Sequence, residues 1–232
     1  MDDIQANAGG QYRPVRKTRI LISVPNTGWV HKHVAIVLLR LIQDRRYDTH
    51  IILPTHNPYE NNLHHIVRDF LEGDFDFWLS FDSDNPPIQN PLDLVEDNLD
   101  IVGFPTPIFH NDIKNRKPKD RPVYWSAYKY VPEKDAYTEW PTKEGLQKVD
   151  AIGTGCFLIA RRVFENPEMQ KGAFTRKLNP DGTVHKGNDI SFCERARENG
   201  FEIYSHFDYP CMHFKEIELS EMVGAFKNLY ET

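Results

Sequence analysis

The chain has 232 residues and a formal net charge of -6, and 40% of its residues are hydrophobic. This length allows one large domain or two small ones with a sizeable buried core, and the acidic balance argues against a generally basic nucleic-acid-binding protein. The three cysteines are odd in number and widely spaced, so they predict neither a disulfide framework nor a zinc ribbon. No apolar run approaches the roughly 18 residues of a membrane helix, and we therefore expect a cytoplasmic protein without a membrane span.

The first half of the chain alternates between short apolar runs and amphipathic stretches. After a predicted flexible tail at residues 1–17, strands are expected at 19–24, 49–54, 75–81 and 100–105, and helices at 30–44, 59–73 and just after Pro91. This alternation predicts an α/β fold with a mostly parallel sheet flanked by helices. Ligands of such sheets bind beyond the carboxyl ends of the strands, so Pro25-Asn26, the segment after Pro54 and Asp82-Ser83-Asp84 should face one crevice.

The pattern changes after Pro105 and predicts a small antiparallel part within the same domain, which we place at 18–232. A basic loop is followed by an aromatic strand at 123–131, a strand near 137–140, and a strand and helix within 149–165. The glycine-rich stretch at 177–189 is predicted to be a mobile loop, before a helix at 190–200, a strand at 201–207 and an amphipathic helix at 216–230. The basic loop contains Lys114, Arg116, Lys117, Lys119 and Arg121.

The basic loop and the aromatic strand beside it could recognise phosphates or stack on rings. They could equally be a solvated loop next to a half-buried strand. A nucleic-acid acceptor therefore stays possible, but the acidic total does not favour it.

Asp82 and Asp84 follow the apolar run "FWLSF" and are separated by one residue. In an extended segment two such carboxylates point the same way and can share Mg²⁺ or Mn²⁺. The alternative is a pair of solvated loop aspartates, but the position at the end of a third parallel strand favours the metal. His213 could supply a neutral imidazole as a further ligand, or be an ordinary packed histidine.

Asp189 lies at the start of the predicted helix at 190–200. It suits a helix N-cap, and Ser191 with Glu194 fits a capping box. It also suits a general base held at a helix start. Gly153 and Gly155, on either side of Thr154, let the backbone approach a ligand closely or mark a β-bulge.

Several segments occur in an order that resembles the GT-A glycosyltransferases, especially small family-2-like members of bacterial and phage type. The segments are "LISVPNTG", "FDFWLSFDSDNPP", "AIGTGCFLIARRVFE", "GNDISFCERARENGFEIY" and "CMHF", which together cover about residues 18–215. The resemblance implies metal-dependent transfer of a sugar from a UDP- or GDP-sugar to an acceptor hydroxyl, with inversion. It also implies a nucleotide-binding half at 18–104 and an acceptor-side half at 105–232.

The same resemblance implies a role for each matching position. Asp84 would bind Mn²⁺ or Mg²⁺ directly, Asp82 would touch the ribose or reach the metal, and His213 would complete the metal site. Asp189 would be the base for the acceptor hydroxyl. The remaining positions would border the donor: Pro25, Asn26, Asn62 and Ser83 along the nucleotide, and Gly153, Thr154 and Gly155 beside the sugar. Inverting members usually carry Glu-Asp where this chain has Asn188-Asp189.

Three other functions compete with this interpretation. An aspartyl phosphatase shares the D-x-D after an apolar strand, but its signature lies on the first strand and continues with Thr or Val rather than Asn85. A nucleotidyltransferase that makes sugar nucleotides would need a glycine-rich, basic loop after the first strand, and "VPNTGWVHKH" suits this poorly. The third is a non-catalytic module of the same fold that binds nucleotides or carbohydrates.

Overall fold

The computed structural model describes residues 4–6, 12–14, 16–109 and 123–216. The predicted basic loop and all but the first residue of the predicted C-terminal helix lie outside these ranges. Within the predicted tail, β1 (Ile4–Ala6) and β2 (Tyr12–Pro14) pair as an antiparallel hairpin.

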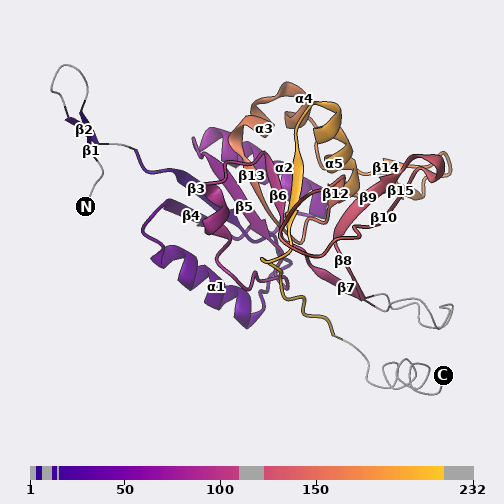
Figure 1. Cartoon of the computed structure of the whole chain (residues 1–232), viewed down its shortest axis with the longest axis horizontal. Helices are drawn as coiled ribbons and strands as arrows, with labels where there is room; N and C mark the ends of the chain where they lie inside the picture. Colours follow the sequence, from indigo (N-terminus) through magenta and orange to yellow (C-terminus); the bar gives the residue numbers. More distant parts are fainter. Residues whose placement is uncertain (1–3, 7–11, 15, 110–122, 217–232) are drawn as a thin grey trace.

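The central sheet contains seven strands in the order β11-β16-β6-β13-β5-β3-β4. β3, β4 and β5 run parallel, while β13 lies antiparallel between β5 and β6, and β16 is parallel to β6. The predicted α/β fold with a mostly parallel sheet is therefore confirmed, and one reversed strand joins its two halves (Figure 1). The bounds are β3 Arg19–Ser23, β4 Asp48–Ile52, β5 Phe77–Phe81, β6 Ile101–Gly103, β11 Leu146–Lys148, β13 Cys156–Ala160 and β16 Ile203–His206.

The aromatic stretch at 123–131 is not the single strand that the sequence predicts. It divides at Ser126 into β8 (Val123–Trp125), which pairs with β7 (Pro107–Phe109), and β9 (Ala127–Val131). β9 lies between β10 (Ala136–Glu139) and β12 (Ala151–Ile152) in a three-stranded antiparallel sheet. At the division, Ser126 N donates to Thr106 O at 3.0 Å, Thr106 N donates to Ser126 Oγ at 3.0 Å, and Gly153 N donates to Ser126 O at 2.8 Å.

The stretch predicted as a loop at 177–189 instead contains an antiparallel hairpin of β14 (Lys177–Leu178) and β15 (Val184–Lys186). Lys177 Nζ donates to Glu194 Oε2 at 2.8 Å, and Lys186 Nζ donates to Glu194 Oε1 at 2.7 Å. Glu194 is only 7% exposed, so it requires positive partners. Lys177 and Lys186, which make the segment polar in sequence, therefore attach the hairpin to α5 through Glu194.

The helices cover both faces of the central sheet. They are α1 (Lys32–Gln43), α2 (Tyr59–Glu72), α3 (Arg161–Glu165), α4 (Pro167–Gln170) and α5 (Asn188–Glu198), with 3₁₀ turns at Pro91–Val95 and Pro132–Lys134. Among the described residues, none of these helices has the length and apolar character needed to cross a membrane.

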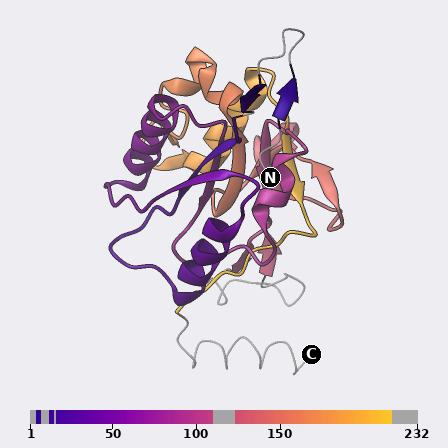
Figure 2. The ribbon, with the colours of Figure 1, turned by 90° about the vertical axis from the view of Figure 1, so that its left-hand side faces the viewer.

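Alternate residues of the central strands belong to two separate hydrophobic clusters, one on each face of the sheet. Ile20, Ile22 and Leu79 pack with α1 on one face, whereas Leu21 and Trp78 pack with α2 and α5 on the other. This alternation is expected for strands that are covered on both sides. Figure 2 shows α1 and α2, in indigo and purple, set apart on different sides of the strands.

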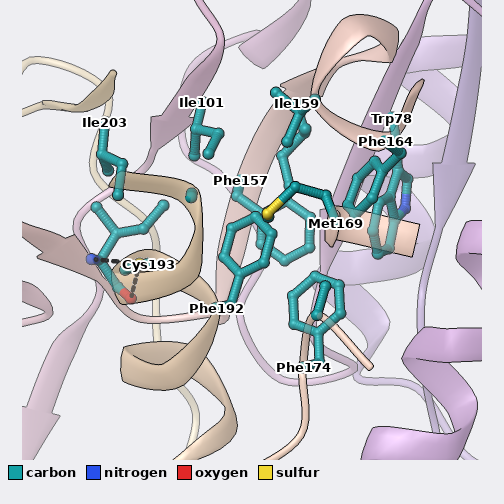
Figure 3. Packing of buried hydrophobic residues seen from close by; sticks show 14 of the residues in the cluster. Trp78, Ile101, Phe157, Ile159, Phe164, Met169, Phe174, Phe192, Cys193 and Ile203 are labelled. Atoms are coloured by element: carbon teal, nitrogen blue, oxygen red, sulfur yellow. Dashed lines mark hydrogen bonds between the residues drawn. The ribbon is translucent and has the colours of Figure 1, made fainter. Parts of the chain in front are cut away.

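An aromatic cluster fills the space between the sheet, α3 and α5 (Figure 3). The Trp78 and Phe157 rings meet edge to face at 5.0 Å, and Phe174 stacks on Phe192 at 4.5 Å. Trp78 Nε1 donates to Ser23 Oγ at 2.8 Å, which satisfies its only polar atom in the core. This packing fixes β5, the strand that leads directly into Asp82.

We expect Phe157→Ala to lower the free energy of unfolding by about 3–5 kcal/mol, because Phe157 is 1% exposed and its removal leaves a cavity against Trp78. Leu39→Ala is the matched control, since Leu39 is 61% exposed on α1 and should change stability by less than about 0.5 kcal/mol. Urea denaturation of both variants checks this. Equal losses would show that the aromatic cluster is not the stabilising core.

Candidate active site

A cleft of about 220 Å³ lies where β3, β4 and β5 end. Parallel strands present their carboxyl ends at one edge of a sheet, so the loops that follow them meet there. The structure therefore brings the three predicted strand-end segments together. The cleft is lined by Pro25, Asn26 and Thr27 after β3, His56 and Asn57 after β4, Tyr59 and Asn62 of α2, and Asp82, Ser83 and Asp84 after β5.

Two asparagine side chains hold together the side of the cleft that is formed after β3 and β4. Asn26 donates from its backbone N–H to Pro54 O at 3.1 Å, and its Oδ1 accepts the Gly28 N–H at 2.8 Å. Gly28 adopts φ +109, a conformation that favours glycine. Asn62 is buried and donates from Nδ2 to Pro54 O at 3.0 Å. One carbonyl, that of Pro54, thus ties the loop after β3 to helix α2.

Each residue of Asp82-Ser83-Asp84 is fixed by a backbone hydrogen bond to a different part of the chain. Asp82 N donates to Gly155 O at 2.9 Å, His31 N donates to Ser83 O at 2.8 Å, and Phe214 N donates to Asp84 O at 3.0 Å. The predicted sugar-side loop, the start of α1 and the "CMHF" segment are therefore all anchored on these three residues.

Asp82 forms a partly buried hydrogen-bonded pair with Tyr59. Tyr59 donates its hydroxyl to Asp82 Oδ1 at 2.7 Å. Burial and, to a lesser degree, the neighbouring Asp84 and Asp189 raise the pKa of Asp82 to about 7, against the opposing effect of the Tyr59 hydrogen bond. Burial and the charge of Asp82 also raise the pKa of Tyr59. The tyrosine hydroxyl therefore stays a donor that orients this carboxyl group toward one fixed position.

Asp84 lies beside His213, as the resemblance implied. His213 Nδ1 is 2.7 Å from the carbonyl oxygen of Pro107, which can only accept, so Nδ1 carries a proton and Nε2 has the lone pair in the neutral imidazole. Nε2 lies 3.8 Å from Asp84 Oδ2, and Lys215 Nζ donates to the same oxygen at 2.8 Å. An imidazole whose far nitrogen is fixed by a carbonyl is the usual arrangement of a histidine that binds a metal.

The predicted metal ligands do not form a ready three-ligand cluster. In the part of the chain that the structure describes, no three His, Cys, Asp or Glu side chains lie close enough to hold an ion together. Asp84 and His213 supply one carboxylate oxygen and one imidazole nitrogen, a donor set that suits Mn²⁺. Asp82 points instead to Tyr59, so a bound ion would complete its coordination with ligand or water oxygens.

Gly153, Thr154 and Gly155 lie next to this carboxylate loop. A Cβ at Gly155 would stand 3.0 Å from Asn85 Nδ2 and from Thr106 Oγ1, and a Cβ at Gly153 would stand 2.9 Å from Ser126 Cβ. Both glycines are therefore required by close packing of the loop against its neighbours. Thr154 lowers the pKa of Tyr59, against the larger effect of burial.

Asp189 is the second residue of α5, and the predicted N-cap and capping box are wrong. The helix begins after Gly187, whose backbone serves as the cap without a side-chain hydrogen bond, and Ser191 is buried inside the first turns. The Asp189 carboxylate folds back so closely that a Cβ on Gly187 would lie 2.7 Å from its Oδ1. Burial raises the pKa of Asp189, which suits a group that takes up a proton.

Two residues of this site were missed by sequence reasoning. Tyr59 could have been found, because it opens the helix that follows a strand end and so must face the same edge of the sheet. No sequence pattern could have indicated Lys215, because the residue it contacts, Asp84, is 131 positions away in the chain.

No family model and no curated protein matches the chain. Among solved structures, the chain is similar to A197 from STIV, with a TM-score of 0.56, 18% identity, and coverage of 86% of this chain and 87% of that one. It is also similar to GalNAc-T7 with UDP, GalNAc and Mn²⁺, with a TM-score of 0.50 and 8% identity over 87% of this chain. The chain spans 44% of the length of that second structure. At these identities the likeness establishes the fold, and the expected GT-A type of α/β fold is confirmed.

The Asp82 carboxyl predicts a pH dependence of stability. Its pKa of about 7 exceeds the ordinary 3.8, so folding favours the protonated form. The stability that this proton contributes is complete below about pH 4 and is lost as the pH rises through 7. We therefore expect Asp82→Asn, which cannot ionise, to melt close to the wild type near pH 4 and above it at pH 8.

Thermal melting of both proteins across this range tests the expectation. Asp93→Asn serves as control, because Asp93 is an exposed carboxylate paired with Arg46 away from the cleft. A melting difference for Asp82→Asn that stays constant from pH 4 to 8 would contradict the raised pKa.

Proposed function

We propose that this protein is a glycosyltransferase that moves a sugar from a nucleotide sugar to an acceptor hydroxyl with the help of Mn²⁺ or Mg²⁺. The observation that carries the proposal is the arrangement of Asp84 Oδ2 and His213 Nε2, 3.8 Å apart, beside a cleft at the carboxyl ends of three parallel strands. A carboxylate and an imidazole beside a cleft at the ends of parallel strands form a donor set that suits a divalent ion bound together with a diphosphate.

Asp84 and His213 would hold the divalent ion. When bound, such an ion neutralises the charge that develops on the leaving diphosphate, so that the leaving group needs no proton. The Pro107 carbonyl keeps the His213 proton on Nδ1 and thereby leaves Nε2 free to coordinate. That GalNAc-T7, a structure of similar fold, contains UDP, GalNAc and Mn²⁺ supports a nucleotide sugar and a divalent ion as ligands here.

The cleft walls would bind the nucleotide part of the donor. Pro25, Asn26 and Asn62 line the side formed by the first two loops, and Asp82 and Ser83 line the opposite side. Asp82, oriented by Tyr59, is placed to accept hydrogen bonds from the ribose hydroxyls. Gly153, Thr154 and Gly155 adjoin Asp82 through the bond from Asp82 N to Gly155 O, which supports their role beside the sugar.

Asp189 would act as the base that receives the proton of the acceptor hydroxyl. Its charge contributes to the raised pKa values of both Asp82 and Tyr59, which supports a position near the donor. Its partly buried carboxylate has a raised pKa, which makes it a better proton acceptor than an exposed one. A base on the side of the sugar opposite to the diphosphate gives inversion at the anomeric carbon.

The competing sugar nucleotidyltransferase function gains no support from the loop after β3. That loop, residues 24–31, contains no lysine or arginine to bind a nucleoside triphosphate. A panel of UDP- and GDP-sugars with Mn²⁺, scored for release of nucleoside diphosphate, tests the proposal. Release of pyrophosphate from a nucleoside triphosphate with a sugar phosphate would favour the competitor, and the absence of both reactions would favour a binding module.

We expect Asp84→Ala to abolish Mn²⁺-dependent binding of UDP or GDP while leaving the fold intact, because its carboxylate is only 18% exposed yet faces the cleft rather than the core. Calorimetry with and without Mn²⁺ measures this. Asp93→Ala is the matched control, since it also removes an aspartate from an ion pair. Nucleotide binding equal to that of the wild type would remove Asp84 from the metal site.

We expect Asp189→Asn to lower the rate of sugar transfer by roughly 10²–10⁴-fold, because an amide cannot accept the proton. Its melting temperature and its affinity for the donor should change little, since Gly187 rather than Asp189 caps α5 and the metal site lies on other residues. Transfer rate, melting and donor affinity are measured on the same variant. A stable variant with near-normal transfer would exclude Asp189 as the base.

A further inference from the structure

Lys215 contacts the metal site of the proposed function, on which its role described below rests. Lys215 Nζ donates to Asp84 Oδ2 at 2.8 Å. The same oxygen faces His213 Nε2 at 3.8 Å. A divalent ion held between His213 Nε2 and this nearest carboxylate oxygen would share the oxygen atom with the lysine ammonium.

Lys215 differs from the other two groups in how firmly it is held. The side chains of Asp84 and His213 are 18% and 10% exposed, whereas that of Lys215 is 52% exposed. Asp84 is fixed through its carbonyl by Phe214 N, and His213 through the Pro107 carbonyl. The lysine side chain is the part of this group that can move, because a long exposed chain loses little when it leaves one partner for water.

We propose that Lys215 is a resident cation of the metal site, which competes with the divalent ion for Asp84 Oδ2 and must leave before the ion can bind. An ammonium and a divalent ion on one oxygen would lie within a few ångströms of each other and repel strongly. In the free protein Lys215 offsets the repulsion between Asp82 and Asp84, and it thereby weakens the site for metal alone. The site then gains its full affinity for the ion only when further oxygens, such as those of a diphosphate, bind with it.

The position of Lys215 in the chain supports this role. Phe214, the preceding residue, stacks on His31 with ring centroids 3.7 Å apart, and the His31 N–H donates to Ser83 O. The backbone that carries Lys215 is thus held against the carboxylate loop. Each time the side chain returns, it meets the same carboxylate at high effective concentration.

The test is titration with Mn²⁺ alone, followed by the electron paramagnetic resonance signal of the free ion. We expect Lys215→Ala to bind Mn²⁺ about 3- to 10-fold more tightly than the wild type. The reason is that the ion no longer has to displace the Lys215–Asp84 ion pair, whose free energy is that of an ordinary exposed pair or somewhat more. Lys215→Arg, which keeps the charge, should stay close to the wild type. Lys148→Ala is the matched control, because Lys148 is an exposed lysine of the edge strand β11 that is ion-paired with Glu202. It should leave Mn²⁺ affinity unchanged.

The outcomes separate this inference from the proposed function. Mn²⁺ affinity of Lys215→Ala that equals or falls below that of the wild type would overturn the role of Lys215. If Asp84→Ala binds Mn²⁺ as tightly as the wild type, the metal site itself is elsewhere and both ideas fall. Lys215→Ala could bind Mn²⁺ more tightly than the wild type while none of the nucleotide sugars releases nucleoside diphosphate. That result would support the role of Lys215 and reject only the glycosyltransferase activity.

Discussion

The arrangement of the site depends on three backbone hydrogen bonds, one for each residue of Asp82-Ser83-Asp84. Through them the loop after β5 holds Gly155, His31 and Phe214, which belong to three distant parts of the chain. Because these bonds use backbone atoms, they leave both carboxylates free to interact with ligands. The hydrophobic core also fixes the position of this loop, because Trp78 packs in the core and lies on β5 a few residues before the loop.

The carboxylates of Asp82 and Asp84 have polar partners that differ in how firmly they are held. Tyr59 satisfies Asp82 with a short hydrogen bond, while Asp84 faces a fixed imidazole and a movable ammonium. Two carboxylates this close would otherwise repel each other. The Tyr59 hydroxyl thus donates to Asp82, and the exposed Lys215 ammonium pairs with Asp84.

The first half of the fold could be predicted from the sequence because its signals are local. Each strand there is a short apolar run, each helix has its own periodicity, and parallel pairing then places the strand ends at one edge. The second half could not, because its structure depends on distant partners. Ser126 breaks a strand only because Thr106 and Gly153 bond to it, and the segment at 177–186 forms a hairpin only because Glu194 needs its lysines. Asp189 resembled an N-cap in the sequence, but the helix starts at Asn188, with Gly187 as its N-cap.

The bond between Lys215 and Asp84 joins residues 131 positions apart, and that separation affects the order in which the molecule can be assembled. Contacts between remote residues form late, because the loop between them must be closed first. During synthesis the two aspartates emerge well before Phe214 and Lys215 can reach them. The carboxylate loop of a nascent chain therefore lacks these partners, and its contacts with them form only after residue 215 has left the ribosome.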